Sequence, residues 1–382
     1  MNNVEIELIS ERYIGRAFQL TSIGVAMDYL SKEMQAKILD YLMEGKLVLK
    51  RDEISKLGNA IAYFIKSNKL CSKQYTSKLR LFYNNSTDRE PLGMLGLIGR
   101  NINPCVQILN ISTKLSHLDL NRSASPPMFI RTYVFSRFRG GEEASRDKIS
   151  IGALWLALAG AIISLTARVR KKQNKQQKRI YEEIYIIPSG SLSNILFIGT
   201  LYRILHYESE DQRVRSFDYI VSELYSIDNL SFDIVLLLAS LIKVSYAIDL
   251  AVPLSLSNLN LLNEFRATRI ETTNRPFVLS EAGLKISRYL EALGTKGRET
   301  LRILFMLLRK SKNIRDSNVR KQLVNSVGKC FNSLFIYAET QDSTTLLDCT
   351  GDVCRLLMAK EVQESRIGNI INMFLSTIKR II

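Results

Sequence analysis

Histidine is nearly absent from this chain, whose 382 residues include only His117 and His206. The scarcity excludes several classes of metal enzyme, because the sequence contains no H-E-x-x-H motif, no H-D pair and no H-x-E followed by C-x-x-C. A Ser-His-Asp or Cys-His site would have to use one of these two residues. We interpret His206 as an ordinary helical residue and His117 as an ordinary residue at a strand-to-loop transition.

Nucleotide-binding motifs are also missing, since the sequence has neither a Walker motif nor a Rossmann fingerprint. Two Glu-Glu pairs remain to be considered. Glu182-Glu183 lies in a predicted strand, where adjacent side chains point to opposite faces and cannot share a metal. Glu142-Glu143 flanks a di-glycine turn, where solvated charge is expected. We therefore predict that the protein is not an enzyme and that it holds no cofactor and no metal.

Cysteine is present in an odd number and without any C-x-x-C pair. This pattern indicates neither a disulfide framework nor a zinc site, so we expect the cysteines to be small buried hydrophobic residues. The five are Cys71, Cys105, Cys330, Cys349 and Cys354. Glu5, Glu7 and Glu11 interrupt the apolar run that a signal peptide would need. We expect the protein to work in the cytoplasm.

Positive charge is the dominant feature of what is present. The formal net charge is +16 and the pI is about 9.6, while 46% hydrophobic and 24% charged residues are ordinary for a folded protein. Residues 122–179 hold 13 Lys/Arg and 3 Asp/Glu, and so carry a net charge of +10. Charge that concentrated repels itself unless an anionic partner is present, which favours a nucleic acid.

The predicted nucleic-acid contacts fall in two runs within this segment. In residues 129–139, aromatic and basic side chains alternate on one face of an extended chain, so that bases could stack while guanidinium groups reach phosphates. A strand with aromatics in the core is the alternative there, and a solvated loop is the alternative for residues 168–179. The contact residues that we predict are Arg131, Tyr133, Arg137, Arg139, Lys148, Arg168, Arg170, Lys171, Lys172, Lys175, Lys178 and Arg179.

The two runs flank 19 uncharged residues, 149–167. Their length and the basic residues that follow resemble a membrane span with a stop-transfer signal. Gly152, Gly160 and several hydroxyl side chains favour a buried core helix instead, and we predict that structure with the span as the alternative. As a single helix, this stretch would hold the two basic runs about 28 Å apart, unless the chain folds them together.

Residue patterning predicts an α+β fold with a mixed N-terminal module and a C-terminal helical bundle. We divide the chain into a mixed nucleic-acid-binding module (1–190), a helical connecting region (191–279) and a helical bundle (280–382). The expected helices are 24–43, one capped by Asp52 through 61–65, 149–167, 191–208, 211–226 and 231–248. The expected strands are 46–50, 104–113, 131–138 and 181–187. Residues 249–279 are less regular.

The last hundred residues have the clearest helical pattern. Ser280 is predicted to cap a helix that Gly294 ends, and a second helix follows over 297–311. Asp316 is predicted to cap a third, and a fourth follows Asp342. A fifth spans about 362–381. Short connections between successive helices indicate antiparallel neighbours in a bundle.

Three segments carry a family resemblance: Asp147–Ala161 (DKISIGALWLALAGA), Tyr181–Gly190 (YEEIYIIPSG) after a basic spacer, and the bundle from about residue 280. Together they resemble the large subunit of an archaeal type I-A CRISPR interference complex (Cascade). The resemblance covers the middle and C-terminal portions of the chain best. That family combines a mixed N-terminal module with a helical bundle, is basic and has no nuclease motif.

The resemblance implies a role in a crRNA-guided antiviral complex. The subunit would sit at the crRNA 5′-handle end, read the protospacer-adjacent motif in duplex DNA, help open the strands and guide the displaced strand. Its partners would be the other Cascade subunits, target double-stranded DNA and a helicase-nuclease, with no stable membrane association. The alternatives are a generic DNA- or RNA-binding accessory factor and a membrane-associated protein anchored by 149–167.

Overall fold

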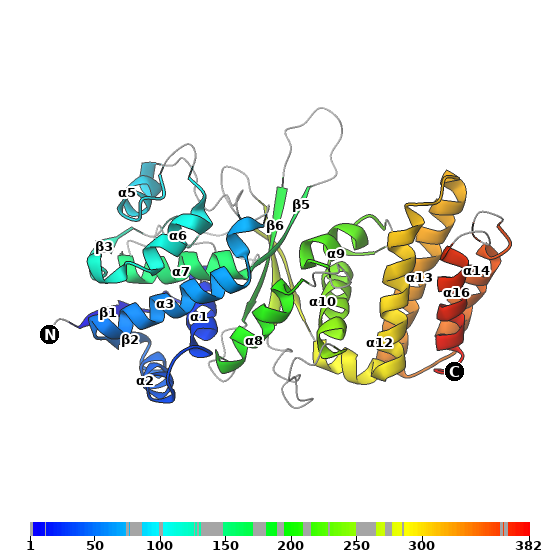
Figure 1. The fold of residues 1–382 in the computed structure, drawn as a ribbon, viewed down its shortest axis with the longest axis horizontal. Helices are drawn as coiled ribbons and strands as arrows, with labels where there is room; N and C mark the ends of the chain where they lie inside the picture. The colour runs from blue at the N-terminus through cyan, green and yellow to red at the C-terminus, as the bar shows by residue number, and fades with distance from the viewer. Residues whose placement is uncertain are drawn as a thin grey trace. The chain divides into compact units, whose positions relative to one another are not determined.

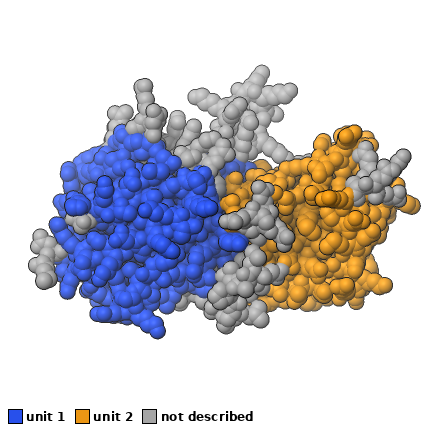
Figure 2. Space-filling model, viewed as in Figure 1, with its two compact units in different colours: residues 1–207, 264–283 blue, residues 208–263, 284–382 orange. Residues whose placement is uncertain are grey.

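The chain folds into two compact units, which we describe from a computed structural model (Figures 1 and 2). Unit 1 comprises Met1–Tyr207 and Glu264–Gly283, and unit 2 comprises Glu208–Asn263 and Leu284–Ile382. The structure describes residues 3–11, 13–73, 76, 86–98, 102–125, 127, 130, 148–170, 181–188, 195–208, 215–227, 230–249, 265–271, 277–284, 286–359, 362 and 366–382. Each unit is assembled from two stretches of chain, whereas the segments expected from the sequence were contiguous.

Unit 1 mixes helices with short antiparallel strands. Its helices are α1 (Ile14–Met27), α2 (Lys32–Met43), α3 (Arg51–Ser67), η1 (Leu70–Ser72), α5 (Ser86–Met94), α6 (Pro104–Ser112), η2 (Leu115–His117), α7 (Ile151–Ser164) and α8 (Ile195–His206). Its strands are β1 (Val4–Glu7), β2 (Lys46–Leu49), β3 (Ser123–Ala124), β4 (Ile149–Ser150), β5 (Leu165–Arg170), β6 (Tyr181–Pro188), β7 (Phe265–Glu271) and β8 (Phe277–Gly283).

Helix α7 forms the centre of unit 1. All 14 of its residues are buried, which fits a helix that is apolar on every face. Helix α1 packs along it at close range, because a Cβ on Gly160 would lie 1.7 Å from the Phe18 carbonyl oxygen. The predicted helix over 149–167 is therefore a core helix, shorter than expected, with strands β4 and β5 on either side.

The predicted alternative of a membrane span is wrong for this stretch. Fourteen residues extend only about 21 Å, against the roughly 30 Å of a bilayer's hydrocarbon core. Among the described residues, no helix has both the length and the apolar character that crossing a bilayer requires.

A four-stranded antiparallel sheet in the order β5-β6-β7-β8 supports α7 and α1. The predicted strand 181–187 is confirmed as β6, and 46–50 is confirmed as β2, which pairs with β1. Strands β7 and β8 were not predicted, because residues 249–279 lack a clear apolar alternation. The pairing of β7 with β6 places Ile184 opposite Arg269 and Ile186 opposite Ala267, and β8 pairs with the other edge of β7.

Three predictions in the N-terminal part need correction. Residues 104–113 form helix α6 rather than a strand, because Asn103 accepts hydrogen bonds from the Cys105 and Val106 amides and Pro104 occupies the first turn. The single helix predicted over 24–43 is two helices, α1 and α2, which break before the Ser31 cap. Helix α3 begins one residue before Asp52, which lies in its first turn.

Unit 2 is helical throughout its described residues. Its helices are α9 (Phe217–Leu224), α10 (Phe232–Asp249), α12 (Ile286–Ser311), α13 (Ser317–Thr340), α14 (Thr345–Leu356) and α16 (Arg366–Ile378). Asp316 caps α13 as predicted, with Oδ1 accepting from the Asn318 and Val319 amides. Gly294 interrupts α12 with φ +57°, as the predicted helix end requires. Ser280 caps no helix, since it lies in β8.

The cysteine prediction is also wrong. Two disulfides are present, Cys71–Cys105 between η1 and α6 and Cys330–Cys349 between α13 and α14. Their Cα atoms lie 5.2 and 5.1 Å apart, within the usual range. Cys354 is free and exposed rather than buried. Sequence spacing did not reveal these pairs because the partners come from different helices. The α+β fold class is confirmed.

Candidate nucleic-acid interface

The clearest functional feature of unit 1 is the connection between β5 and β6. The two strands are antiparallel neighbours, and their last pair is Arg170 opposite Tyr181. The Cα atoms of Arg170 and Tyr181, which flank residues 171–180 in the sequence, therefore lie roughly 5 Å apart. The sequence between these two strand ends has a net charge of +5, because it has no acidic residue and contains Lys171, Lys172, Lys175, Lys178 and Arg179.

Arg168 does not belong to the exposed part of this basic run. It lies in β5 opposite Glu183 of β6, and its Nε is 3.7 Å from Glu183 Oε1. The two side chains are only 8% and 1% exposed. Tyr185 also donates a 2.7 Å hydrogen bond to Glu183 Oε2. Because the Arg168 charge is balanced inside the protein, the prediction that Arg168 binds phosphate is corrected.

Glu182 points to the other face of the sheet, as expected for the residue adjacent to Glu183. It is 3% exposed and pairs with Arg269 of β7, whose Nη1 lies 3.5 Å from Glu182 Oε2. Each carboxylate thus has its own arginine on its own face. The two acids do not form a shared metal site, and among the described residues no group of three His, Cys, Asp or Glu side chains could hold a metal.

Lys148 is exposed and directly precedes β4, which pairs with β3. Strand β3 lies near one end of α7, while β5 and β6 lie at the other end (Figure 1). Lys148, beside β4, and strands β5 and β6 therefore lie at opposite ends of α7. Of the other predicted contacts, Arg170 ends β5, whereas Arg131, Tyr133, Arg137, Arg139, Lys171, Lys172, Lys175, Lys178 and Arg179 lie outside the described residues.

The two histidines lie on different helices of unit 1. His206 is buried in α8, as the sequence indicated, and its Nε2 lies 2.7 Å from the Ile163 carbonyl oxygen. His117 is exposed at the end of the short helix η2, rather than at a strand end as expected. Among the described residues, no hydrogen bond joins either ring to a nucleophile or to an orienting acid, the pair that hydrolytic catalysis requires.

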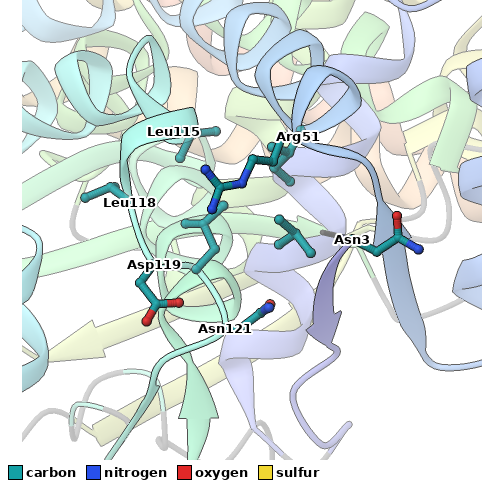
Figure 3. A pocket seen from close by; sticks show the side chains of 9 residues that line it. Asn3, Arg51, Leu115, Leu118, Asp119 and Asn121 are labelled. Atoms are coloured by element: carbon teal, nitrogen blue, oxygen red, sulfur yellow. The ribbon is translucent and has the colours of Figure 1, made fainter. Parts of the chain in front are cut away.

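A pocket in unit 1 is lined by Asn3 and Asn121, by Arg51 of α3 and by Asp119 (Figure 3). The remaining lining is apolar, from Val4, Ile54, Leu115, Leu118 and Leu120. Asn121 Oδ1 accepts a hydrogen bond from the Glu5 amide at 3.1 Å, so this residue connects β1 to the loop that precedes β3. The charges of Arg51 and Asp119 cancel, so the pocket has no net positive charge that would attract an anionic polymer.

A second basic region lies in unit 2 and was not predicted. Six basic residues occur between positions 309 and 321, with Asp316 as the only acid. They surround the connection from α12 to α13, and we call them the α12–α13 corner: Arg309, Lys310, Lys312, Arg315, Arg320 and Lys321. A count of charged residues along the sequence would have revealed this region. Only the helical pattern of the segment was considered.

Arginine and tyrosine side chains meet beside this corner. Arg215, just before α9, and Arg309 of α12 both contact Tyr219, with guanidinium carbons 5.2 and 5.7 Å from the ring centroid. Two turns earlier on α12, Arg302 lies 5.7 Å from the ring centroid of Tyr246. Burial lowers the pKa of Arg302 and raises that of Tyr246, although each partner opposes the shift of the other.

Comparison with known proteins adds no identification, since the chain matches no protein-family model and no curated protein. The functional proposal therefore rests on the chemistry of the chain's own residues.

Proposed function

We propose that this protein binds nucleic acid without catalysing a reaction on it. The observation that carries the proposal is the β5–β6 connection, where five basic residues and no acid are held between Arg170 and Tyr181. The nearest acidic residues of the sheet, Glu182 and Glu183, are already paired with Arg269 and Arg168. We infer that an external anion meets the positive charge carried by residues 171–180.

Phosphates of a nucleic acid are the partner that suits this arrangement. A short segment with five cations can contact several successive phosphates, and each contact releases condensed counterions. Such contacts position a strand but do not read its sequence. The aromatic-basic residues Arg131, Tyr133, Arg137 and Arg139 would add stacking to this backbone binding.

Within this function we propose the role of the large subunit of a crRNA-guided antiviral complex in the cytoplasm. The resemblance of Asp147–Ala161, Tyr181–Gly190 and the C-terminal helices to that archaeal family supports it, as does the combination of an α+β unit with a helical unit. In such systems, base pairing with the RNA reads most of the target, and the protein reads only a short adjacent motif. A protein that is basic and not an enzyme fits that division of labour.

The binding function is tested by changing Lys171, Lys172, Lys175 and Lys178 together to Gln in the full chain. Anisotropy of a labelled mixed-sequence duplex is measured between about 50 and 300 mM salt. We expect the slope of log K against log salt to fall in magnitude by up to about 3.6, since about 0.9 is lost for each phosphate contact with a duplex.

The matched control removes four exposed lysines elsewhere in unit 1, with the same change in net charge: Lys32, Lys66, Lys69 and Lys114, each to Gln. The control should leave affinity within about twofold of the parent chain at the same salt concentration. Equal losses in both variants would attribute binding to net charge alone and would refute a site at the β5–β6 connection.

The proposed complex is tested by purifying the tagged chain from its native host. We expect a uniform-length RNA and several partner proteins to copurify. Recovery of the chain alone, with nucleic acid of random length, would instead identify a generic DNA- or RNA-binding accessory factor.

A further inference from the structure

We propose that the α12–α13 corner of unit 2 is a second nucleic-acid-binding surface, which contacts the phosphodiester backbone and does not read bases. This inference rests on the proposed binding function but uses a different unit and different residues. The corner lies at the end of unit 2 opposite the C-terminus (Figure 1). It forms where α12 ends at Ser311 and α13 begins at Ser317.

The charges of the corner are poorly balanced by the protein itself. Lys312 pairs with the buried carboxylate of Glu223, at 2.5 Å between Nζ and Oε1. Lys310, Arg315, Arg320 and Lys321 form no ion pair with any described residue, and the last three are exposed. The only acid within the corner, Asp316, uses its carboxylate to cap α13. Arg315, before α13, and Arg320 and Lys321, in the first two turns of that helix, therefore face solvent.

Beside the corner, Tyr219 holds two guanidinium groups close together. Arg215 and Arg309 both lie within 6 Å of its ring centroid. The Nε atoms of both arginines are buried and donate no hydrogen bond to a described residue. Fully buried Lys243 donates a 2.6 Å hydrogen bond to the Arg215 carbonyl oxygen, which fixes the backbone at that point. Two like charges held this way repel each other unless an anion approaches.

The contact pattern identifies phosphate rather than a base as the group bound. Tyr219 has two arginines against its ring and Tyr246 has one, so these rings orient guanidinium groups. Guanidinium groups preorganised on aromatic rings make bidentate hydrogen bonds to phosphate oxygens. We therefore expect binding that tolerates any sequence and responds strongly to salt.

The test changes Arg320 and Lys321 together to Gln in the full chain and measures anisotropy of a labelled mixed-sequence single strand and of a duplex. We expect affinity at about 100 mM salt to fall roughly tenfold for at least one probe, and the salt slope to fall by about 1.4 to 1.8. Arg309→Gln, which removes one guanidinium from Tyr219, should reduce the slope by about 0.7 to 0.9. Circular dichroism identifies any variant that fails to fold, and Arg320→Lys then tests the same site.

The matched control changes Lys379 and Arg380 to Gln, which removes one lysine and one arginine that are exposed at the opposite end of unit 2. It should bind both probes like the parent chain. If the corner variant binds normally while the β5–β6 lysine variant is impaired, the corner proposal is overturned and the proposed function stands. If the corner variant is impaired while the β5–β6 lysine variant binds normally, the corner proposal is supported and the site at the β5–β6 connection is not. If only binding to phosphatidylserine vesicles is lost, the surface is a lipid-binding one and the proposal fails.

Discussion

Arg168 and Glu183 face each other across β5 and β6, with Nε and Oε1 3.7 Å apart and both side chains almost fully buried. A residue that the sequence placed in an exposed basic run is thus an internal cation of the sheet. The other basic residues predicted for this run are Arg170, which ends β5, and those that follow it in the sequence.

We predict that Glu183→Gln destabilises the protein by about 3 kcal/mol, because it removes the carboxylate that lies 3.7 Å from the buried Arg168 guanidinium. Urea unfolding at neutral pH measures the change. The double variant Arg168→Met with Glu183→Leu should lie within about 1 kcal/mol of the parent chain, since it removes both charges. An Arg168→Met variant that stays folded but loses nucleic-acid affinity would restore Arg168 as a contact residue.

Gly160→Ala should be among the most damaging small substitutions in the chain. The added Cβ would lie 1.7 Å from the Phe18 carbonyl oxygen, so α1 and α7 must separate. We expect a loss of about 3 kcal/mol or more in unfolding free energy. Gly351→Ala in α14 is the matched control, because nothing lies within 4 Å of its Cβ position, and it should stabilise the protein by up to about 1 kcal/mol. Equal effects of the two substitutions would refute the close packing of α1 on α7.

The Lys37–Glu53 pair predicts a defined pH dependence. Burial raises the pKa of Glu53, but hydrogen bonds from Lys37 Nζ and the Lys50 amide outweigh it, so the folded-state pKa lies below the ordinary value. The stabilisation is therefore complete above the unfolded pKa, about 4.3, and is lost as the pH falls through the folded value.

Glu53→Gln tests this, because Gln keeps an acceptor for the Lys50 amide and removes only the charge. We expect it to cost about 0.5 to 1 kcal/mol at pH 7 and to approach the parent chain near pH 3, as measured by urea unfolding at both pH values. A difference between the two proteins that stays constant with pH would contradict the ion pair.

The thiol content of the oxidised protein provides another check. Cys71, Cys105, Cys330 and Cys349 are paired, so alkylation under denaturing conditions without reductant should label only Cys354. After reduction, all five should be labelled. Peptide mass spectrometry distinguishes the two states. Labelling of Cys71 or Cys330 before reduction would contradict the corresponding disulfide.

Local patterns predicted the elements whose stabilising contacts lie close in sequence. The Asp316 cap, the break at Gly294 and the apolar strand 181–187 were all readable, because each depends on a few neighbouring residues. The β-branched residues of 104–113 misled the prediction, since the Asn103 cap outweighs strand propensity there.

Contacts between distant residues explain what the sequence did not reveal. Strand β7 carries Arg269, whose charge is compensated by Glu182 more than 80 positions earlier, so no local pattern marks it as a buried strand. The pairing of Cys71 with Cys105 likewise depends on η1 and α6 lying side by side. The Tyr219 contacts join α9 to α12 and cannot be inferred from either segment alone.

The central claim is that this protein binds nucleic acid through solvent-facing positive charge, and the salt dependence of binding by the unmodified chain tests it most directly. Affinity for a mixed-sequence duplex, measured between about 50 and 300 mM salt, should give a log–log slope of about −4 or steeper, as expected for five or more phosphate contacts. A slope between 0 and about −1, or no binding at the lowest salt concentration, would contradict the account.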